Sequence, residues 1–355
     1  MGTLIKLSIK IRVMKKSITC KGLELKTFNS DIIDSYVPKS GDVGVFEVIE
    51  IGKHNSIQGI NGNNCYLFEG DRFCAAFGNR YATEQFEGYV PNSPTLELDI
   101  LGKGGVVGVM SSMHMKFDKV GTTKVRLVSY ATDKDGRVLN TIYYNKFKVG
   151  FKNFPKPNSN IILSLGCSMD SGKTTTAAYL ARSLKLSGKT VAFIKLTGTY
   201  YTKDAHFVRD CGADISIDFG LAGYPSTYML DTPEILDLFA FLLEKVKVKQ
   251  PDYIIVEIAD GLFQRETEAL LQSDRFKHFI DHTIFSGVDS LSAINGYNIL
   301  SELDLRPFAL TGLFTASPLL YNEVRQRVRI PVLDLEGLIN QAPTLLNPIR
   351  FAKSA

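Results

Sequence analysis

One stretch of this sequence specifies a strand, a loop and a helix in that order. The letters GCSMDSGKTTT run from Gly166 to Thr176, between the apolar run Ile161 to Leu163 and a helix-like run from Ala177 to Leu186. A glycine-containing loop that leads into a helix exposes unpaired backbone N–H groups, and the positive end of the helix dipole lies beside them. This arrangement is typical of a site for phosphate groups.

Two side chains of this phosphate loop, Gly166 to Thr174, suit a nucleotide. Lys173 would reach the β and γ phosphates, and the hydroxyl of Thr174 would bind Mg²⁺. The glycine at Gly166 comes one residue earlier than the usual spacing, so an ordinary strand-to-helix turn remains the alternative. We expect the nucleotide contacts to come from Gly166, Asp170, Ser171, Gly172, Lys173, Thr174 and Thr175.

Length and composition allow two domains of an ordinary globular protein. The chain has 355 residues and a net charge of +4, which is too small to indicate a nucleic-acid partner by itself. The five cysteines are an odd number without CxxC spacing, so we expect reduced thiols. No apolar run approaches the ~20 residues of a membrane span. The alternation from Leu4 to Val13 favours a strand over a signal peptide, and we expect a cytoplasmic protein.

The two halves of the chain differ in pattern. Up to about Val149, short apolar runs alternate with turn residues, which predicts a β-rich barrel or sandwich. Within it, Asp133 to Gly136 predicts a hairpin turn between two strands. The polar segment Lys152 to Asn160 contains two prolines and marks a boundary. We therefore expect a β-rich domain over 1–151, a linker over 152–160 and a second domain over 161–355.

The second half alternates strand-like and helix-like segments. Such alternation predicts an α/β fold, with a mainly parallel sheet, helices on both faces and ligands at the carboxyl ends of the strands. The expected strands are 161–165, 190–195, 253–257, 283–286 and 308–314, and the expected helices are 173–186, 233–248, 290–303 and 318–328.

Two further strands of this half end in charged residues. Tyr253 to Glu257 is an apolar strand that ends in a carboxylate, which Mg²⁺ beside the phosphate loop could compensate; a helix cap or surface acid is the alternative. The strand that ends at Lys195 delivers an ammonium group suited to a transferring phosphoryl group, or one that is simply solvated. We expect Lys173, Lys195 and Glu257 to be the catalytic residues and Thr174 and Glu257 to bind the metal.

Three motifs together resemble a known family. The spacing from Gly166 to Thr174, the strand Val191 to Gly198, and Val256 to Gly261 are similar, in this order, to motifs of the dethiobiotin synthetase family. They are also similar to the cobyrinate amidases and to uncharacterised phosphate-loop proteins with a β-rich N-terminal domain. The resemblance covers roughly residues 161–335. It implies a P-loop NTPase that uses ATP and Mg²⁺, commonly to phosphorylate a carboxylate, with Lys195 at the substrate.

Several polar residues follow these strands and are candidates for substrate contacts. Loops at the carboxyl ends of such strands line the ligand crevice. Arg265 suits a γ phosphate, although an ion pair with Glu266 or Glu268 explains it equally well. Other candidates are Thr197, Tyr200, Lys203, Asp204, His206, Arg209, Ser226 and Asp260. In the N-terminal half, Asn79 to Gly88 could close over the nucleotide or be an ordered surface loop.

These observations leave three functions open. The main hypothesis is an ATP-dependent ligase or kinase for a small-molecule carboxylate, expected to form a homo-oligomer. The alternative is a nucleotide-driven switch or partner-loading ATPase. A nucleic-acid-dependent NTPase is the weakest, because lysines near the N-terminus, such as Lys6 and Lys10, have no neighbouring aromatic platform. Neither the substrate nor the choice of ATP over GTP follows from the sequence.

Overall fold

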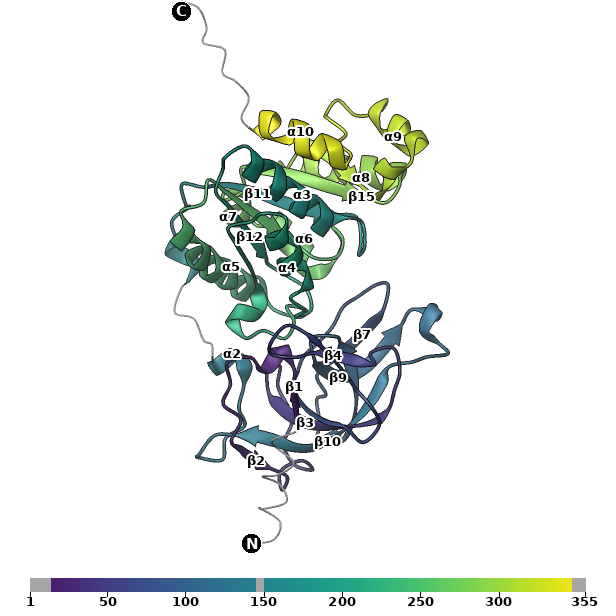
Figure 1. Ribbon diagram of the computed structural model, residues 1–355, viewed down its shortest axis with the longest axis vertical. Helices are drawn as coiled ribbons and strands as arrows, with labels where there is room; N and C mark the ends of the chain where they lie inside the picture. Colours follow the sequence, from purple (N-terminus) through teal and green to yellow (C-terminus); the bar gives the residue numbers. More distant parts are fainter. Residues whose placement is uncertain (1–13, 145–149, 347–355) are drawn as a thin grey trace, which may run out of the picture. The chain divides into compact units, whose positions relative to one another are not determined.

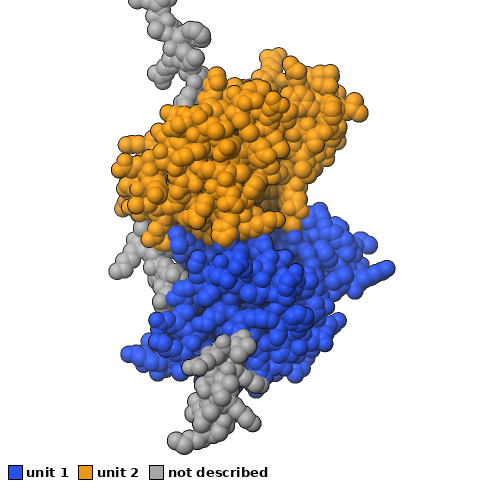
Figure 2. All heavy atoms as spheres, in the orientation of Figure 1, with its two compact units in different colours: residues 1–147, 198–202, 219–229 blue, residues 148–197, 203–218, 230–355 orange. Residues whose placement is uncertain are grey.

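The computed structural model describes residues 14–144 and 150–346, and the chain divides into two compact units (Figure 2). The first unit comprises Met1–Phe147 together with Gly198–Thr202 and Phe219–Met229. The second comprises Lys148–Thr197, Lys203–Asp218 and Leu230–Ala355, and so includes the expected linker 152–160. The expected strand from Leu4 to Val13 lies outside the described residues. The sequence did not predict that two short segments of the second half would belong to the first unit.

The first unit is a β-barrel. Its strands pair in a closed ring, β6 with β3, β3 with β10, β10 with β8, β8 with β9 and β9 with β6. Figure 1 labels β3, β9 and β10 of this ring. Closure removes exposed edges, and large aromatic side chains such as Phe46, Phe73 and Phe77 fill the interior. The ring strands are β3 (Val43–Glu50), β6 (Arg72–Phe77), β8 (Glu97–Gly102), β9 (Val106–Met113) and β10 (Thr123–Thr132). Others are β1 (Lys15–Lys16), β2 (Thr27–Asn29), β4 (Ser56–Gln58), β5 (Asn64–Tyr66) and β7 (Phe86–Tyr89).

The expected hairpin turn is present, but only one of its arms is a strand. Gly136 has a φ of +78°, and Asp133 donates its N–H to the carbonyl of Arg137. After the turn, Val138 makes only a bridge to Thr132, and the chain then enters the short helix α2 (Thr141–Tyr144). The prediction of a second strand was wrong, because α2 replaces the pairing that would have extended it.

The second unit is built on a parallel sheet of order β13-β12-β14-β11-β15-β16. The strand that leads into the phosphate loop therefore lies between the strands that end at Glu257 and at Gly287. The chain crosses from one side of β11 to the other after β14, and such a reversal places a ligand crevice at the carboxyl ends of these strands. The strands are β11 (Asn160–Gly166), β12 (Val191–Lys195), β13 (Ile215–Asp218), β14 (Tyr253–Glu257), β15 (His282–Gly287) and β16 (Ala309–Gly312).

The expected helices of this unit are present with small shifts at their ends. They are α3 (Lys173–Leu186), α5 (Thr232–Val246), α8 (Ser290–Glu302) and α9 (Pro318–Arg325). The last expected strand ends early, since Gly312 turns the chain into a 3-10 turn. The expected strands and helices do not include β13, α4 (Lys203–Asp210), α6 (Arg265–Gln272), α7 (Asp274–Lys277) or α10 (Leu335–Leu346).

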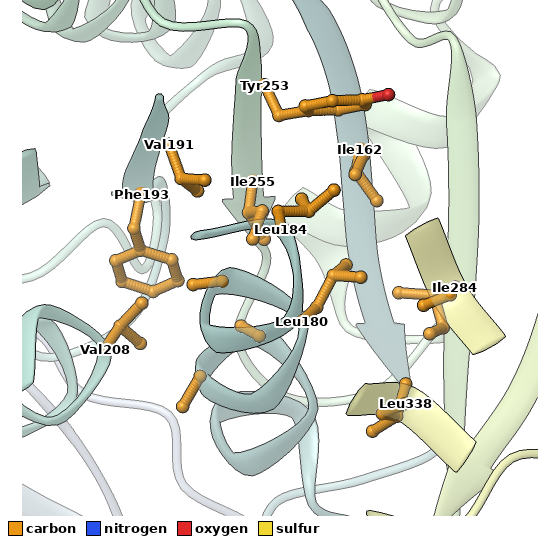
Figure 3. Packing of buried hydrophobic residues seen from close by; sticks show 14 of the residues in the cluster. Ile162, Leu180, Leu184, Val191, Phe193, Val208, Tyr253, Ile255, Ile284 and Leu338 are labelled. Atoms are coloured by element: carbon orange, nitrogen blue, oxygen red, sulfur yellow. The ribbon is translucent and has the colours of Figure 1, made fainter. Parts of the chain in front are cut away.

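Small and aliphatic side chains of α3 pack against the centre of one face of the sheet (Figure 3). Leu180 and Leu184 pack with Ile162, Ile255 and Ile284, which come from three neighbouring strands. Residues of α4 and α10 complete this layer. The alternate side chains of the strands are buried as well, so both faces of the sheet are covered. This packing holds the start of α3 rigidly against the end of β11.

Within the described residues, no helix combines the length and the apolar character that crossing a membrane requires.

Candidate functional site

The first turn of α3 has no side chain to cap it. Gly172 precedes the helix with a φ of +99° and provides no side-chain acceptor, whereas Asp231 caps α5 and Asp289 caps α8. The N–H groups at the start of α3 therefore lack the partner that the other two helices have. Asp170 also has a positive φ of 58° within the loop. Such a backbone turns amides inward and suits an anion.

Lys173 lies within the loop rather than in solvent. Its side chain is buried, and its ammonium group donates to the carbonyl of Ser168 at 2.5 Å. Burial lowers the pKa of Lys173, while the nearby carboxylates of Glu257 and Asp260 oppose that shift. The ammonium group is thus held by the loop at the place where an anion would meet the helix start.

Glu257 ends β14 directly beside the phosphate loop. The hydroxyl of Thr174 donates to its Oε1 at 3.1 Å, and the Lys195 ammonium lies 3.4 Å from the same oxygen. The other oxygen, Oε2, is buried and has no hydrogen-bond partner among the described residues. Burial raises the pKa of Glu257, and Lys195 opposes this effect. A buried carboxylate with an orphaned oxygen requires a further cation or donor.

Lys195 is already engaged by two acids. Besides Glu257, it forms an ion pair with Asp204 in the first turn of α4. Burial alone would lower the pKa of Lys195, but these two carboxylates more than offset it and the pKa is raised. The sequence placed Lys195 correctly at the carboxyl edge but did not indicate that Asp204 is its partner.

The donors present fit a Mg²⁺-bound nucleotide. The orphaned Oε2 of Glu257 and the hydroxyl of Thr174 are hard oxygen ligands on neighbouring elements, as Mg²⁺ prefers. Among the described residues there is no group of three or more acids, histidines or cysteines that could hold an ion alone. A metal here would need oxygens from a ligand as well, which nucleotide phosphates supply.

The second unit therefore combines a parallel sheet with a phosphate loop between β11 and α3. Its fold is that of a P-loop NTPase. No protein-family model matches the sequence, and no curated protein is detectably similar to it.

Solved structures with weak overall similarity include the signal recognition particle receptor FtsY from Elizabethkingia anophelis in complex with GDP. It is 17% identical with a TM-score of 0.35, and the match covers 51% of this chain and 60% of that one. The hydrogenase maturation factor HypB from Archaeoglobus fulgidus is 14% identical with a TM-score of 0.36, covering 54% and 91%. Chloroplast FtsY from Physcomitrella patens is also 14% identical, with a TM-score of 0.36 and coverages of 58% and 72%. At these scores the fold assignment rests on the topology of this chain.

The expected substrate residues do not form one cluster. Thr197 is buried, and its hydroxyl accepts the N–H of Ala259 at 2.9 Å, so it joins the ends of β12 and β14. Lys203 and Arg209 are exposed on α4. Ser226 is buried in the first unit, where its hydroxyl accepts the N–H of Tyr228.

Two other candidates lie on the loop and helix after β14. Asp260 has a φ of 61° and acts electrostatically on Lys173. Arg265 donates to Glu266 at 2.6 Å and to the carbonyl of Leu230 at 3.2 Å. The ion pair with Glu266, which was one of the two interpretations of Arg265, is present.

The segment from Asn79 to Gly88, which is rich in polar side chains, is ordered by contacts within the first unit. Asn79 accepts the N–H of Val90, and Glu87 accepts hydrogen bonds from Tyr89 and Tyr228 at 2.5 and 3.2 Å. The Tyr81 ring also packs against Tyr228. These contacts connect residues 79–88 with the segment Phe219–Met229.

One glycine next to the phosphate loop escaped the sequence analysis. Gly312 ends β16 with a φ of +115°, and a Cβ there would lie 2.6 Å from the nitrogen of Gly287 and 2.8 Å from the carbonyl oxygen of Ser171. The only sequence signal was a glycine directly after an apolar run. Its contact with Ser171 depends on the sheet order, which the sequence does not reveal.

Proposed function

We propose that the second unit binds a Mg²⁺-bound nucleoside triphosphate and hydrolyses it, and that the protein works as a nucleotide-driven switch. The buried, orphaned Oε2 of Glu257 beside the uncapped start of α3 is the observation that carries the nucleotide site. Backbone amides of the phosphate loop would bind the phosphates.

The side chains of the site have separate tasks in this proposal. The Lys173 ammonium offsets negative charge on the β and γ phosphates, and Thr174 and Glu257 hold Mg²⁺. When bound, Mg²⁺ neutralises the charge that develops on the phosphate oxygens. The hydrogen bond from the N–H of Ala259 to the hydroxyl of Thr197 joins the chain after Glu257 to the end of β12 and so keeps the two strand ends together.

The switch reading is supported by the path of the chain. Directly after Thr197, the chain leaves the second unit and contributes Gly198–Thr202 to the first; after β13 it does so again with Phe219–Met229. Both segments therefore begin at the carboxyl edge where the nucleotide is expected. A conformational change at that edge therefore acts on segments of the chain that belong to the first unit.

An ATP-dependent ligase or kinase for a small carboxylate is the second candidate. Lys195 at the strand end beside Glu257 favours it, because an ammonium there would stabilise a phosphoryl group in transfer. ATP is the expected nucleotide by resemblance, and a homo-oligomer remains a prediction.

Turnover and binding measurements test these proposals. Binding of ATP, GTP and their diphosphates is measured by calorimetry with and without Mg²⁺, and failure to bind any of them contradicts the nucleotide site. Phosphate release is then measured for the protein alone and with pools of carboxylic acids and amines. A switch shows slow turnover that no metabolite accelerates, whereas a ligase or kinase shows a large rise with one compound.

A further inference from the structure

Three charged side chains meet at the carboxyl edge of the second unit. Lys195 and Glu257 occupy the same register position on neighbouring parallel strands, so their side chains point to the same face of the sheet. Asp204 reaches the same ammonium group from α4. Glu257 and Lys195 are 2% and 13% exposed at the side chain, whereas Asp204 is 30% exposed. The two acids thus differ in their access to water.

Because of this difference, leaving Glu257 without a cation costs more free energy than leaving Asp204 without one. A buried carboxylate without a compensating cation loses its hydration and gains nothing in return, whereas a half-exposed one keeps part of its water. The Lys195 ammonium contacts Oε1 of Glu257, the oxygen that also accepts the hydrogen bond from Thr174. Within residues 14–144 and 150–346, Oε2 has no partner. The single ammonium group therefore compensates only one oxygen of this carboxylate.

We propose that Lys195, which Glu257 shares with Asp204, is the resident counter-cation of Glu257 in the metal-free protein, and that it gives up its contact with Glu257 to Mg²⁺ while it keeps its ion pair with Asp204. Asp204 is then a positioning residue, because its carboxylate holds the ammonium group when the contact with Glu257 is lost. The ammonium group therefore does not compete with the metal for Glu257. The exchange of cations rests on the proposed nucleotide function, whereas the resident counter-cation does not.

The position of Asp204 suits this task. It lies in the first turn of α4, where the helix dipole stabilises a carboxylate. Helix α4 follows Gly198–Thr202, the segment that belongs to the first unit. Loss of the contact between Lys195 and Glu257 therefore leaves the ammonium group paired with the start of the helix that follows this segment.

The first test is the stability of the full-length protein in EDTA without nucleotide. Lys195→Met leaves Glu257 buried without its cation, and we expect the melting temperature to fall on the order of 10 °C. The matched control is Lys185→Met, which removes another lysine–aspartate pair of the same unit. Its Lys185–Asp214 distance is 2.5 Å, and its lysine is more exposed than Lys195. That variant should melt within about 2 °C of the wild type.

A double variant separates charge compensation from lost packing. Glu257→Gln in the Lys195→Met background removes the uncompensated charge, so most of the lost melting temperature should return. If Lys195→Met is no less stable than Lys185→Met, or if Glu257→Gln restores nothing, Lys195 is not a counter-cation and the proposal is overturned.

The second test concerns Asp204 and remains available if Lys195→Met does not fold. Binding of a fluorescent nucleoside diphosphate is measured while Mg²⁺ is titrated. In Asp204→Asn the ammonium keeps only Glu257 as a partner and competes with the metal, so half-maximal enhancement of binding should need several-fold more Mg²⁺. Binding in EDTA, measured for the same variant, separates this effect from any change in the affinity for the nucleotide alone.

The outcomes of the two tests are distinguishable. An unchanged Mg²⁺ requirement in Asp204→Asn contradicts the role of Asp204. If the wild type binds no nucleotide, the proposed function fails and with it the exchange of cations. The melting measurements in EDTA still decide whether Lys195 compensates Glu257.

Discussion

Lys173 illustrates how much one side chain can matter to a site while contributing little apolar packing. Its ammonium group is buried and has a loop carbonyl as its hydrogen-bond acceptor. A phosphate group would be a stronger partner, because the interaction would then join two charges. We therefore regard the loop carbonyl as the partner of Lys173 in the absence of ligand.

Replacing Lys173 with alanine should abolish Mg²⁺-dependent hydrolysis, by a factor of at least about 100, because an ammonium aimed at the transferred phosphoryl group is lost. The fold should remain cooperative, since the change removes a buried ammonium group whose hydrogen-bond acceptor is the carbonyl of Ser168 rather than a carboxylate. Phosphate release and circular dichroism on the same sample measure both effects. Retained turnover in this variant would contradict the assigned role.

His54 in the barrel predicts a pH dependence of stability. Its ring is buried, and its Nε2 lies 3.2 Å both from the carbonyl oxygen of Leu101 and from an amino group of Arg80. Burial and then the charge of Arg80 lower the pKa of His54 to about 3. The folded protein therefore keeps His54 neutral while the unfolded chain protonates it below a pKa of about 6.5.

Stability should consequently decrease as the pH falls from about 6.5 towards 3. Between pH 7.5 and 5.5, His54 alone should cost about 1 kcal/mol in the free energy of unfolding. Denaturant titrations at both pH values measure this loss. The His54→Gln variant cannot take up the proton and should lose about 1 kcal/mol less over the same range. An equal loss in both proteins would show that His54 does not titrate as described.

At the scale of elements, the ends of β15 and β16 brace the phosphate loop. Gly312 lies against the backbone of Gly287 and Ser171, and its φ of +115° disfavours any L side chain. The close approach is possible only because both strand ends carry glycine. The geometry of the loop thus depends on strands that contribute no ligand themselves.

Gly312→Ala should destabilise the protein and weaken nucleotide binding together. Gly188, with a φ of +77° and open space around it, is the matched control. Gly188→Ala should cost about 1 kcal/mol through its backbone conformation alone, whereas Gly312→Ala should cost at least about 3 kcal/mol because its Cβ also collides with backbone. Melting curves and nucleotide titrations of both variants provide the comparison. Equal effects would mean that the bracing is unimportant.

At the scale of the whole molecule, the first unit includes chain from the other half of the sequence. Gly198 and Thr227 pair through their backbones, and Thr202 exchanges hydrogen bonds with Gln58 of the barrel. The carbonyl of Gly223 accepts a hydrogen bond from Thr141 at 2.6 Å. Both inserted segments, Gly198–Thr202 and Phe219–Met229, are therefore integral parts of the first unit.

If the protein is a switch, nucleotide should change the hydrogen exchange of these two segments. The triphosphate and diphosphate states should differ in Gly198–Thr202 and Phe219–Met229 because both begin at the carboxyl edge of the sheet that carries the proposed nucleotide site. Strand β3 is the internal control, since its exchange should be the same in both states. Mass spectrometry of peptic peptides measures this difference. Identical exchange in both segments would favour a ligase or kinase over a switch.

Much of the second unit could be predicted from local pattern. The strand 253–257 and the helix 173–186 have the expected ends, since a continuous apolar run and a glycine–helix junction each depend on neighbouring residues only. Strand β13 and helix α10 were missed. Helix α10 contains Pro343, and β13 is only four residues long, so tertiary burial rather than local preference stabilises them.

The sequence by itself determined the strand, loop and helix around Gly166 to Lys173, the parallel α/β character of one half and the β-rich character of the other. These depend on periodicity and on backbone preferences, which act over a few residues. Only the tertiary structure decided that Asp204 pairs with Lys195, that Gly312 touches Ser171, and that two segments after β12 and β13 belong to the first unit. Such contacts join residues from different strands and loops, and strand order, which sets them, is a property of the folded sheet as a whole.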